Sequence, residues 1–307
     1  MTSAGIARFT PCDDRTAVGL IGLGLVGTAL AGRLLDRGFA IIGYDIDPAR
    51  IEALVAIGGH PASGPADVAR YCSRIFLALM NTSIVQQVIE GPGGMMEATP
   101  LPSHILDVST GNPEETRALA ERLRRQGIAF LDCPVSGSSR LIRSGHGVFL
   151  VGGRAEDFEF CRDLFEALSA RAVHLGPSGS GSKAKLASNL ILGLNRAALA
   201  EGLVLAEKLG LDLPQFLELL RISPAYSRAV DDKGAKMIQG DFRAEARLSQ
   251  HHKDLSIILE TAESLGLELP LARVHSRVLQ EGIESGEGDL DNSAVIRAIR
   301  RRTKTSP

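Results

Sequence analysis

The sequence predicts an α/β protein in which a domain with a doubly wound parallel sheet is followed by an all-α domain, the two joined by a long helix. Over the first half of the chain, short apolar runs alternate with helical patterns. Such alternation is typical of parallel sheets covered by helices. After residue 178 the strand patterns nearly vanish. A length of 307 residues fits two domains of roughly 150 residues each.

The first half contains compact apolar runs of the kind that form buried parallel strands. We predict a helix at residues 25–37, because Gly38 follows it as a C-terminal cap. Asp47 and Asn112 each precede a proline and open further helices, since a capping side chain followed by proline is typical of a helix start. Another helix is predicted at 158–168. Strands are predicted at residues 17–21, 40–44, 75–80, 105–108, 128–132 and 148–151.

The second half is predicted to be helical. Its first helix, at 183–209, is unbroken for about 27 residues, or roughly 40 Å at 1.5 Å per residue. We expect residues 1–15 to form a flexible tail, 16–178 a dinucleotide-binding domain and 179–307 a domain for substrate binding and oligomerisation. Further helices are predicted at residues 214–220, 227–238, 247–265, 271–285 and 293–301.

Composition excludes several classes of protein. Lys+Arg is 34 against 36 Asp+Glu, so the basic excess of a nucleic-acid binder is missing. The sequence contains no run of 18 apolar residues, so no membrane span is expected. The cysteines form no CxxC pair, which favours reduced thiols in a cytoplasmic protein. No metal site is expected, because the adjacent His251 and His252 lack an acid-and-histidine constellation around them.

A glycine motif lies between the first predicted strand and helix. Gly22 permits the tight turn, Gly24 lets a diphosphate approach the backbone, and Gly27 permits close packing of helix on strand. With Leu25 and Val26 in the first helical turn, this motif predicts a Rossmann dinucleotide site, the alternative being a structural glycine turn.

Asp45 ends the second predicted strand, where an acid accepts hydrogen bonds from the adenosine ribose. Its carboxylate would repel a 2′-phosphate, so NAD is favoured over NADP, although Arg50 could meet a phosphate.

Lys185 and Asn189 are four residues apart and share one face of the long helix. The positive helix end and partial burial both lower a lysine pKa toward the range useful for proton transfer. On spacing alone, a solvated lysine at a helix end is the more frequent alternative.

The chain resembles the β-hydroxyacid dehydrogenase family, which includes 3-hydroxyisobutyrate dehydrogenase and tartronate semialdehyde reductase. The resemblance covers residues 17–300 and places its motifs in the same order. The motifs are the glycine stretch at 19–34, Asp132-Cys-Pro-Val-Ser-Gly137, Gly179-x-Gly181-x-x-x-Lys185-x-x-x-Asn189 and Lys253-Asp254-Leu255.

The resemblance implies a role for each motif. Lys185 would be the general acid/base, and Asn189 would position the substrate. Lys253 would approach the nicotinamide, with Asp254 bracing that region. The substrate carboxylate would be bound by Ser136, Gly137 and Ser138. The nicotinamide side of the cofactor site would include Leu79, Met80, Ser109 and Thr110.

Some positions depart from the family pattern. Ser138 stands where the second glycine of SGG is usual, and Arg140 or Arg143 could add an anion contact, although solvent-facing arginines are the favoured alternative because arginines are mostly exposed. The resemblance implies oxidation of a short 3-hydroxy acid with NAD, or reduction of the semialdehyde, by a homo-oligomer that is a dimer or tetramer. An imine reductase, a non-catalytic NAD(H)-binding regulatory protein and a sugar-phosphate dehydrogenase remain as alternatives.

Overall fold

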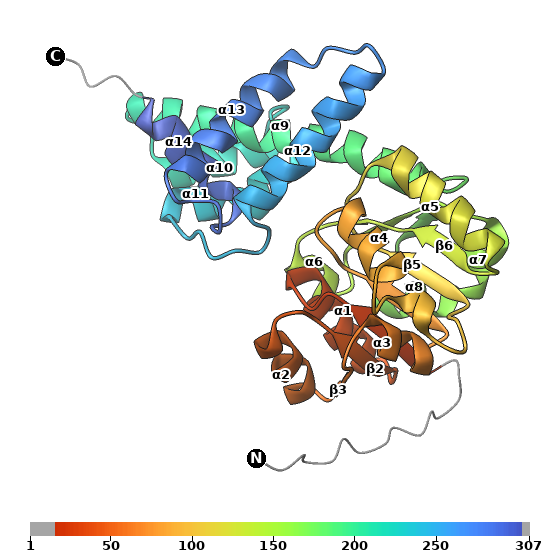
Figure 1. Ribbon diagram of the computed structural model, residues 1–307. Helices are drawn as coiled ribbons and strands as arrows, with labels where there is room; N and C mark the ends of the chain where they lie inside the picture. The colour runs from red at the N-terminus through yellow and green to blue at the C-terminus, as the bar shows by residue number, and fades with distance from the viewer. Residues whose placement is uncertain (1–15, 303–307) are drawn as a thin grey trace. The chain divides into compact units, whose positions relative to one another are not determined.

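The computed structural model describes residues 16–302 of the chain (Figure 1). It divides into two compact units, Met1–Ser182 and Lys183–Pro307. The predicted tail at 1–15 lies outside the described residues. Each unit has apolar clusters of its own, and each is described by itself.

The first unit is built on a six-stranded parallel sheet with the order β3-β2-β1-β4-β5-β6. The order reverses between β1 and β4, and such sheets bind ligands beyond the carboxyl ends of the strands at this point. The fold class predicted from the alternating pattern is therefore confirmed. The strands are β1 (Ala17–Ile21), β2 (Ala40–Tyr44), β3 (His60–Pro61), β4 (Arg74–Leu77), β5 (His104–Asp107) and β6 (Ala129–Asp132).

Helices cover both faces of this sheet (Figure 1). Leu30 of α1 and Leu164 of α8 belong to one apolar cluster, whereas Val68 of α3, Val85 of α4 and Leu119 of α5 belong to the other. Caps explain where several helices begin, since Asp47, Asn81 and Asn112 each accept a hydrogen bond from a first-turn N–H. The helices are α1 (Leu25–Leu35), α2 (Pro48–Ala56), α3 (Pro65–Tyr71), α4 (Thr82–Glu90), η1 (Met95–Glu97) and α5 (Pro113–Arg125).

A second, three-stranded sheet follows β6. Strand β7 (Val135–Ser136) pairs antiparallel with β8 (Val148–Val151), and β8 pairs parallel with β9 (Ala172–His174). The strand predicted at 148–151 thus lies outside the large sheet. Helix α6 (Ser139–Arg143) precedes β8, and the helix predicted at 158–168 is two helices, α7 (Ala155–Phe160) and α8 (Arg162–Leu168), that meet at Cys161.

The second unit is helical around one apolar cluster. Its long helix α9 (Ser180–Lys208) starts three residues earlier than predicted and has 29 residues. The helix predicted at 227–238 is instead a π-helical turn followed by a short α-helix. The elements after α9 are α10 (Leu213–Ile222), η2 (Val230–Gly234), α11 (Ala235–Gln239), α12 (Leu248–Ser264), α13 (Pro270–Glu284), η3 (Asn292–Ala294) and α14 (Val295–Arg301).

Among the described helices, α9 has the length and apolar composition that crossing a membrane would need. This was not expected from the sequence, because α9 contains no uninterrupted run of 18 apolar residues. The core helix of a water-surrounded domain meets the same two criteria. Within the most apolar window of α9, 44% is buried inside the protein.

Candidate active site

The glycine motif after β1 forms a loop that is tightly packed at two of its glycines. Gly22 has φ +94°, and a Cβ built there would lie 2.4 Å from the carbonyl oxygen of Ala78. A Cβ on Gly27 would lie 1.9 Å from the carbonyl oxygen of Gly22. At Gly24, by contrast, the nearest atom to such a Cβ is Nη1 of Arg50 at 3.9 Å. The backbone is therefore open beside Gly24 alone.

Helix α1 begins directly after Gly24, and no side chain caps its N-terminus. The first N–H groups of a helix and its dipole favour an anion at this end. Together with the open backbone at Gly24, this arrangement fits the diphosphate of a dinucleotide. The residues that would hold it are Gly22, Gly24, Leu25, Val26 and Gly27.

Asp45 at the end of β2 is buried and accepts several hydrogen bonds. Its Oδ2 accepts from the backbone N–H of Leu23 at 2.7 Å, and its Oδ1 accepts from that of Asp47 at 2.9 Å. Arg50 lies 3.2 Å from Asp45 Oδ2 through Nη1 and 3.4 Å from Asp47 Oδ2 through Nε. Asp45 thus braces the glycine loop, and two carboxylates share one guanidinium beside it.

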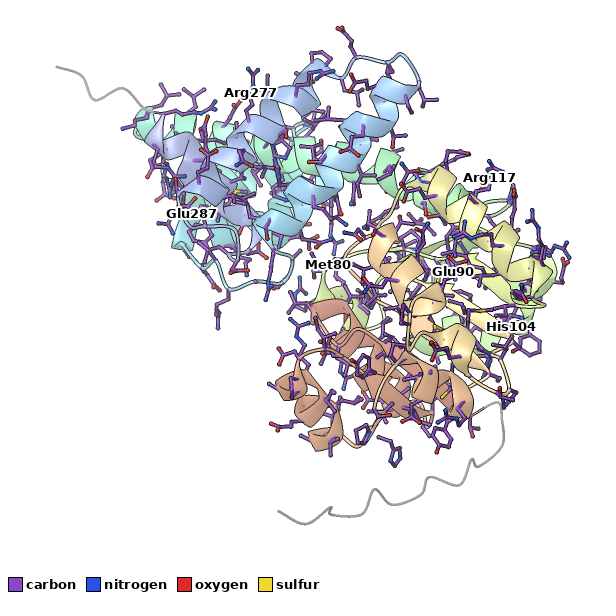
Figure 2. All side chains as sticks on the ribbon, in the orientation of Figure 1. Met80, Glu90, His104, Arg117, Arg277 and Glu287 are labelled. Atoms are coloured by element: carbon purple, nitrogen blue, oxygen red, sulfur yellow. The ribbon has the colours of Figure 1, made fainter. Side chains whose placement is uncertain are left out.

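The ends of β4 and β5 are joined by Ser109. Its Oγ accepts a hydrogen bond from the N–H of Leu79 at 2.9 Å, and its own N–H donates to Asp107 Oδ1 at 2.9 Å. Thr110 is half-buried. Met80, which is labelled in Figure 2, is 53% exposed. Because β4 pairs with β1, these residues and the glycine loop lie at the same carboxyl edge of the sheet.

Asp132 at the end of β6 holds the start of helix α9. Its carboxylate accepts hydrogen bonds from the N–H groups of Gly179 at 2.7 Å and Ser182 at 2.8 Å. Burial raises the pKa of Asp132, and these hydrogen bonds oppose the rise. Gly181 allows the contact, since a Cβ there would lie 2.2 Å from the carbonyl oxygen of Leu150. The glycines of the Gly-x-Gly-x-x-x-Lys pattern therefore fix where the helix begins.

The predicted substrate loop begins at Ser136, the last residue of β7. Ser136 is half-buried, and Gly137 is exposed with φ +144°. Ser138, where the family pattern has glycine, caps α6 by accepting a 3.4 Å hydrogen bond from the N–H of Leu141.

The two arginines of this region differ in their surroundings. Arg143 makes an ion pair with Asp36 at the end of α1, so its guanidinium is held on that helix. Arg140 is exposed.

In the second unit, Lys185 and Asn189 lie on α9 and are buried. Asn189 Nδ2 donates to Asp254 Oδ2 at 3.0 Å, and Lys253 Nζ lies 2.8 Å from Asp254 Oδ1. Burial lowers the pKa of Lys185, Lys253 lowers it further, and the carboxylate of Asp254 opposes the change. The amine is therefore easier to deprotonate than an exposed lysine, while the amide of Asn189 has a fixed direction.

The predicted site residues thus fall into two groups, one in each unit. Asp132 was named as part of a motif, but its contact with the start of α9 was not predicted, because the two lie 47 residues apart in the sequence. Sequence reasoning also missed that Arg196 and His275 are buried in the second unit, since periodicity alone does not mark a buried charge. The first-unit group is Gly22, Gly24, Leu25, Val26, Gly27, Asp45, Leu79, Met80, Ser109, Thr110, Ser136, Gly137 and Ser138, and the second-unit group is Lys185, Asn189 and Lys253.

Two family models match consecutive parts of the chain. Residues 17–176 match the NAD-binding domain of 6-phosphogluconate dehydrogenase. Residues 179–299 match the NAD-binding family of NADP-dependent 3-hydroxyisobutyrate dehydrogenase.

Individual relatives cover nearly the whole chain. The 2-(hydroxymethyl)glutarate dehydrogenase of Eubacterium barkeri is 33% identical over 290 residues, which are 94% of this chain and 96% of the relative. The 2-hydroxy-3-oxopropionate reductase of Escherichia coli is 31% identical over 282 residues, or 92% and 96% of the two chains.

A solved structure of 3-hydroxyisobutyrate dehydrogenase from Salmonella typhimurium has a TM-score of 0.83 at 25% identity, with 92% of this chain and 99% of that chain covered. An imine reductase from Pseudomonas sp. shares the fold at a TM-score of 0.59 and 18% identity. The family matches and the curated relatives together show that this chain belongs to the β-hydroxyacid dehydrogenase family of NAD(P)-dependent oxidoreductases acting on CH–OH groups.

Proposed function

We propose that the protein oxidises the hydroxyl of a short 3-hydroxy acid with NAD, or reduces the matching semialdehyde, with Lys185 as the general acid/base. The observation that carries the proposal is the second-unit cluster, in which a buried lysine with a lowered pKa shares a helix face with an amide of fixed direction. A general base works best when its pKa lies near the working pH, and burial moves Lys185 in that direction.

Lys185 has one task in each direction of the reaction. When bound, the dinucleotide supplies the hydride acceptor for oxidation and the hydride donor for reduction. In the oxidation, the uncharged Nζ of Lys185 accepts the proton of the substrate hydroxyl. In the reduction, the charged Nζ returns a proton to the carbonyl oxygen.

The remaining residues would bind and orient. Asn189 would position the hydroxyl or carboxylate of the substrate, because its amide is held by Asp254. The substrate carboxylate would be bound by the hydroxyls of Ser136 and Ser138 and by the backbone at Gly137. The polar run Ser138-Ser139-Arg140 favours a polyhydroxylated acid as the substrate.

The preference for NAD rests on the charges beside the glycine loop. Asp45 and Asp47 carry two negative charges against the single positive charge of Arg50. A 2′-phosphate would meet a net negative site, whereas ribose hydroxyls could donate to Asp45. Lys253 would contact the nicotinamide end of the cofactor.

We propose two further properties, the assembly of copies and the cellular compartment. Ile191 and Leu205 of α9 are each more than 60% exposed, and their spacing places them on one face of the helix, which supports a homo-oligomer. Cys72, Cys133 and Cys161 are buried free thiols, which supports a reducing compartment and so the cytoplasm.

The test is turnover of a panel of short hydroxy acids with NAD and with NADP, followed by the absorbance of NADH or NADPH. Lys185→Ala is expected to lower kcat by about 10²- to 10⁴-fold, the usual contribution of a positioned general base. Its NADH affinity should remain, because the glycine loop is untouched. Lys183→Ala is the matched control, since Lys183 is exposed on the same helix.

Wild-type kcat in Lys185→Ala would remove the lysine from the mechanism. Turnover of imines but not of hydroxy acids would favour an imine reductase. Tight NADH binding without turnover of any substrate would favour a regulatory protein.

A further inference from the structure

Three polar side chains are buried together among the helices of the second unit. His251 of α12 is 6% exposed, while His275 of α13 and Arg196 of α9 are each 3% exposed. The Nε2 atoms of the two histidines are 3.2 Å apart. One ring must donate and the other accept, which requires an unprotonated nitrogen at this contact. Neither Nη1 of Arg196 nor Nδ1 of His275 has a hydrogen-bond partner among the described residues.

The surroundings keep both rings uncharged. Burial lowers the pKa of His251 well below its usual value, and Arg196 and His275 lower it further, as do Lys185 and His252. Burial together with Arg196 and His252 lowers the pKa of His275 to about 4. Carboxylates are present in the same interior, but Asp254 is hydrogen-bonded to Asn189, and Asp291 is paired with Lys233. The pair is therefore neutral around pH 7.

His251 lies directly against the backbone of helix α9. A Cβ built on Gly193 would be 2.5 Å from Nε2 of His251, so only glycine permits this approach. Asn189 lies one turn before Gly193 on α9, and Asp254 lies about one turn after His251 on α12. Asn189 and Asp254 are themselves hydrogen-bonded. The Gly193–His251 contact and the Asn189–Asp254 hydrogen bond are therefore about one helical turn apart along the interface of α9 and α12.

We propose that the hydrogen-bonded His251–His275 pair, which we call the histidine pair, is a positioning unit for the reaction. His275 holds the ring of His251 against Gly193, and that ring sets the separation of α9 and α12 where Asn189 meets Asp254. The pair acts on Asn189 and Lys253 through Asp254, and it does so only while both rings are uncharged. The inference rests on the proposed function.

Two substitutions of one residue separate positioning from packing. His275→Gln retains a side-chain nitrogen or oxygen within reach of His251 but takes up no proton. His275→Leu removes the hydrogen bond and leaves Nε2 of His251 buried without a partner. Val278→Ala is the control, because Val278 is a buried residue of the same helix with no part in the pair.

The readouts are kcat and KM for the hydroxy acid, the Kd for NADH from NADH fluorescence, and the Tm. We expect His275→Leu to lower kcat/KM by about tenfold or more, since a buried group is left unsatisfied next to the site. The Kd for NADH should stay within about twofold, because the glycine loop lies in the other unit. His275→Gln and Val278→Ala should both stay within about threefold of wild-type kcat/KM.

A second readout tests the charge state without any substrate. Unfolded histidines titrate near 6.5 and the buried pair below that, so the unfolded chain binds more protons as the pH falls. The stability due to the neutral pair is present above about pH 6.5 and is lost on the way down to about pH 4. The Tm of the wild type should therefore fall more steeply between about pH 7 and 5 than that of His275→Gln.

Each outcome has a stated meaning. If Val278→Ala and His275→Leu lose kcat/KM equally at similar Tm, the histidine pair contributes only packing and has no positioning role. Equal pH slopes of Tm in the wild type and His275→Gln would refute the neutral pair. If Lys185→Ala loses activity but His275→Leu keeps the kcat/KM of the wild type, the positioning role is overturned and the proposed function stands. If the wild type turns over no hydroxy acid at all, both are overturned.

Discussion

At the scale of single residues, the proposed chemistry depends on how the protein changes the pKa of one amine. Lys185 sits in the interior of the second unit, where removal from water penalises its charged form. Lys253 acts in the same direction and Asp254 acts against both. The balance favours a lysine that can lose its proton below its ordinary pKa of 10.5.

This balance predicts a pH dependence. Oxidation needs the uncharged amine, so kcat/KM for the hydroxy acid should rise with pH through an apparent pKa below 10.5, and the reduction should fall through the same range. Asp254→Asn removes the charge that raises the pKa of Lys185 while keeping a hydrogen-bonding side chain. The inflection should therefore move to lower pH in that variant. A shift to higher pH would contradict the assignment of Lys185.

Cofactor choice is also decided by individual charges. Asp45→Asn removes the buried carboxylate beside the glycine loop but can still accept from the N–H of Leu23. We expect its ratio of kcat/KM for NAD to that for NADP to fall by about tenfold or more, since a charge that repels phosphate is lost. Arg50→Ala should raise the ratio, because the net charge beside the loop becomes more negative. An enzyme that prefers NADP before any substitution would show that Arg50 outweighs the two acids.

At the scale of elements, the start of helix α9 sets the positions of the proposed catalytic residues. Asp132 of β6 binds the N–H groups of Gly179 and Ser182, so the end of one strand fixes the beginning of the helix. Lys185 then follows Gly181 by about one turn, and Asn189 follows Lys185 by another. A shift in the start of α9 would therefore displace both Lys185 and Asn189.

Gly181→Ala tests this element. Its Cβ would lie 2.2 Å from the carbonyl oxygen of Leu150, so the helix start must shift. We expect a loss of about 1–3 kcal/mol in the free energy of unfolding, the usual cost of overpacking, together with a lower kcat. Gly64→Ala is the control, since a Cβ there meets nothing within 4 Å. It should lose less than about 1 kcal/mol in urea unfolding, because Gly64 is the N-cap of α3 and alanine is a poorer capping residue than glycine. Equal stability of the two variants would refute the close packing at Gly181.

At the scale of the whole molecule, the apolar face of α9 predicts association of copies. Ile191 and Leu205 are 63% and 61% exposed, and burying them against a second chain would remove apolar area from water. The double variant Ile191→Glu/Leu205→Glu should therefore have a lower molar mass by light scattering than the wild type. Ile222→Glu is the control, because Ile222 is 87% exposed on a different helix, α10. A monomeric wild type would contradict the proposed oligomer.

The sequence by itself determined the elements whose signals are local. The spacing of Gly22, Gly24 and Gly27 between an apolar run and a helical pattern predicted the glycine loop, because Gly22 and Gly27 lie against backbone that leaves no room for a Cβ, while Gly24 stays open. The strands at 17–21 and 40–44 coincide with β1 and β2. The loss of strand patterns after residue 178 likewise predicted the helical second half.

Only the tertiary structure decided which residues far apart in the sequence come into contact. Asp132 meets Gly179 across 47 positions, and Asn189 meets Asp254 across 65. Such contacts depend on how whole elements pack, and no periodicity of a single segment contains that information. Residues 148–151 pair with β7 and β9 in a separate sheet. The apolar pattern of one strand does not indicate which strands it pairs with, because pairing depends on the path of the chain between them. Burial of Lys185 is also a tertiary property, because the environment that lowers its pKa is built by residues of α12 as well as by its own helix.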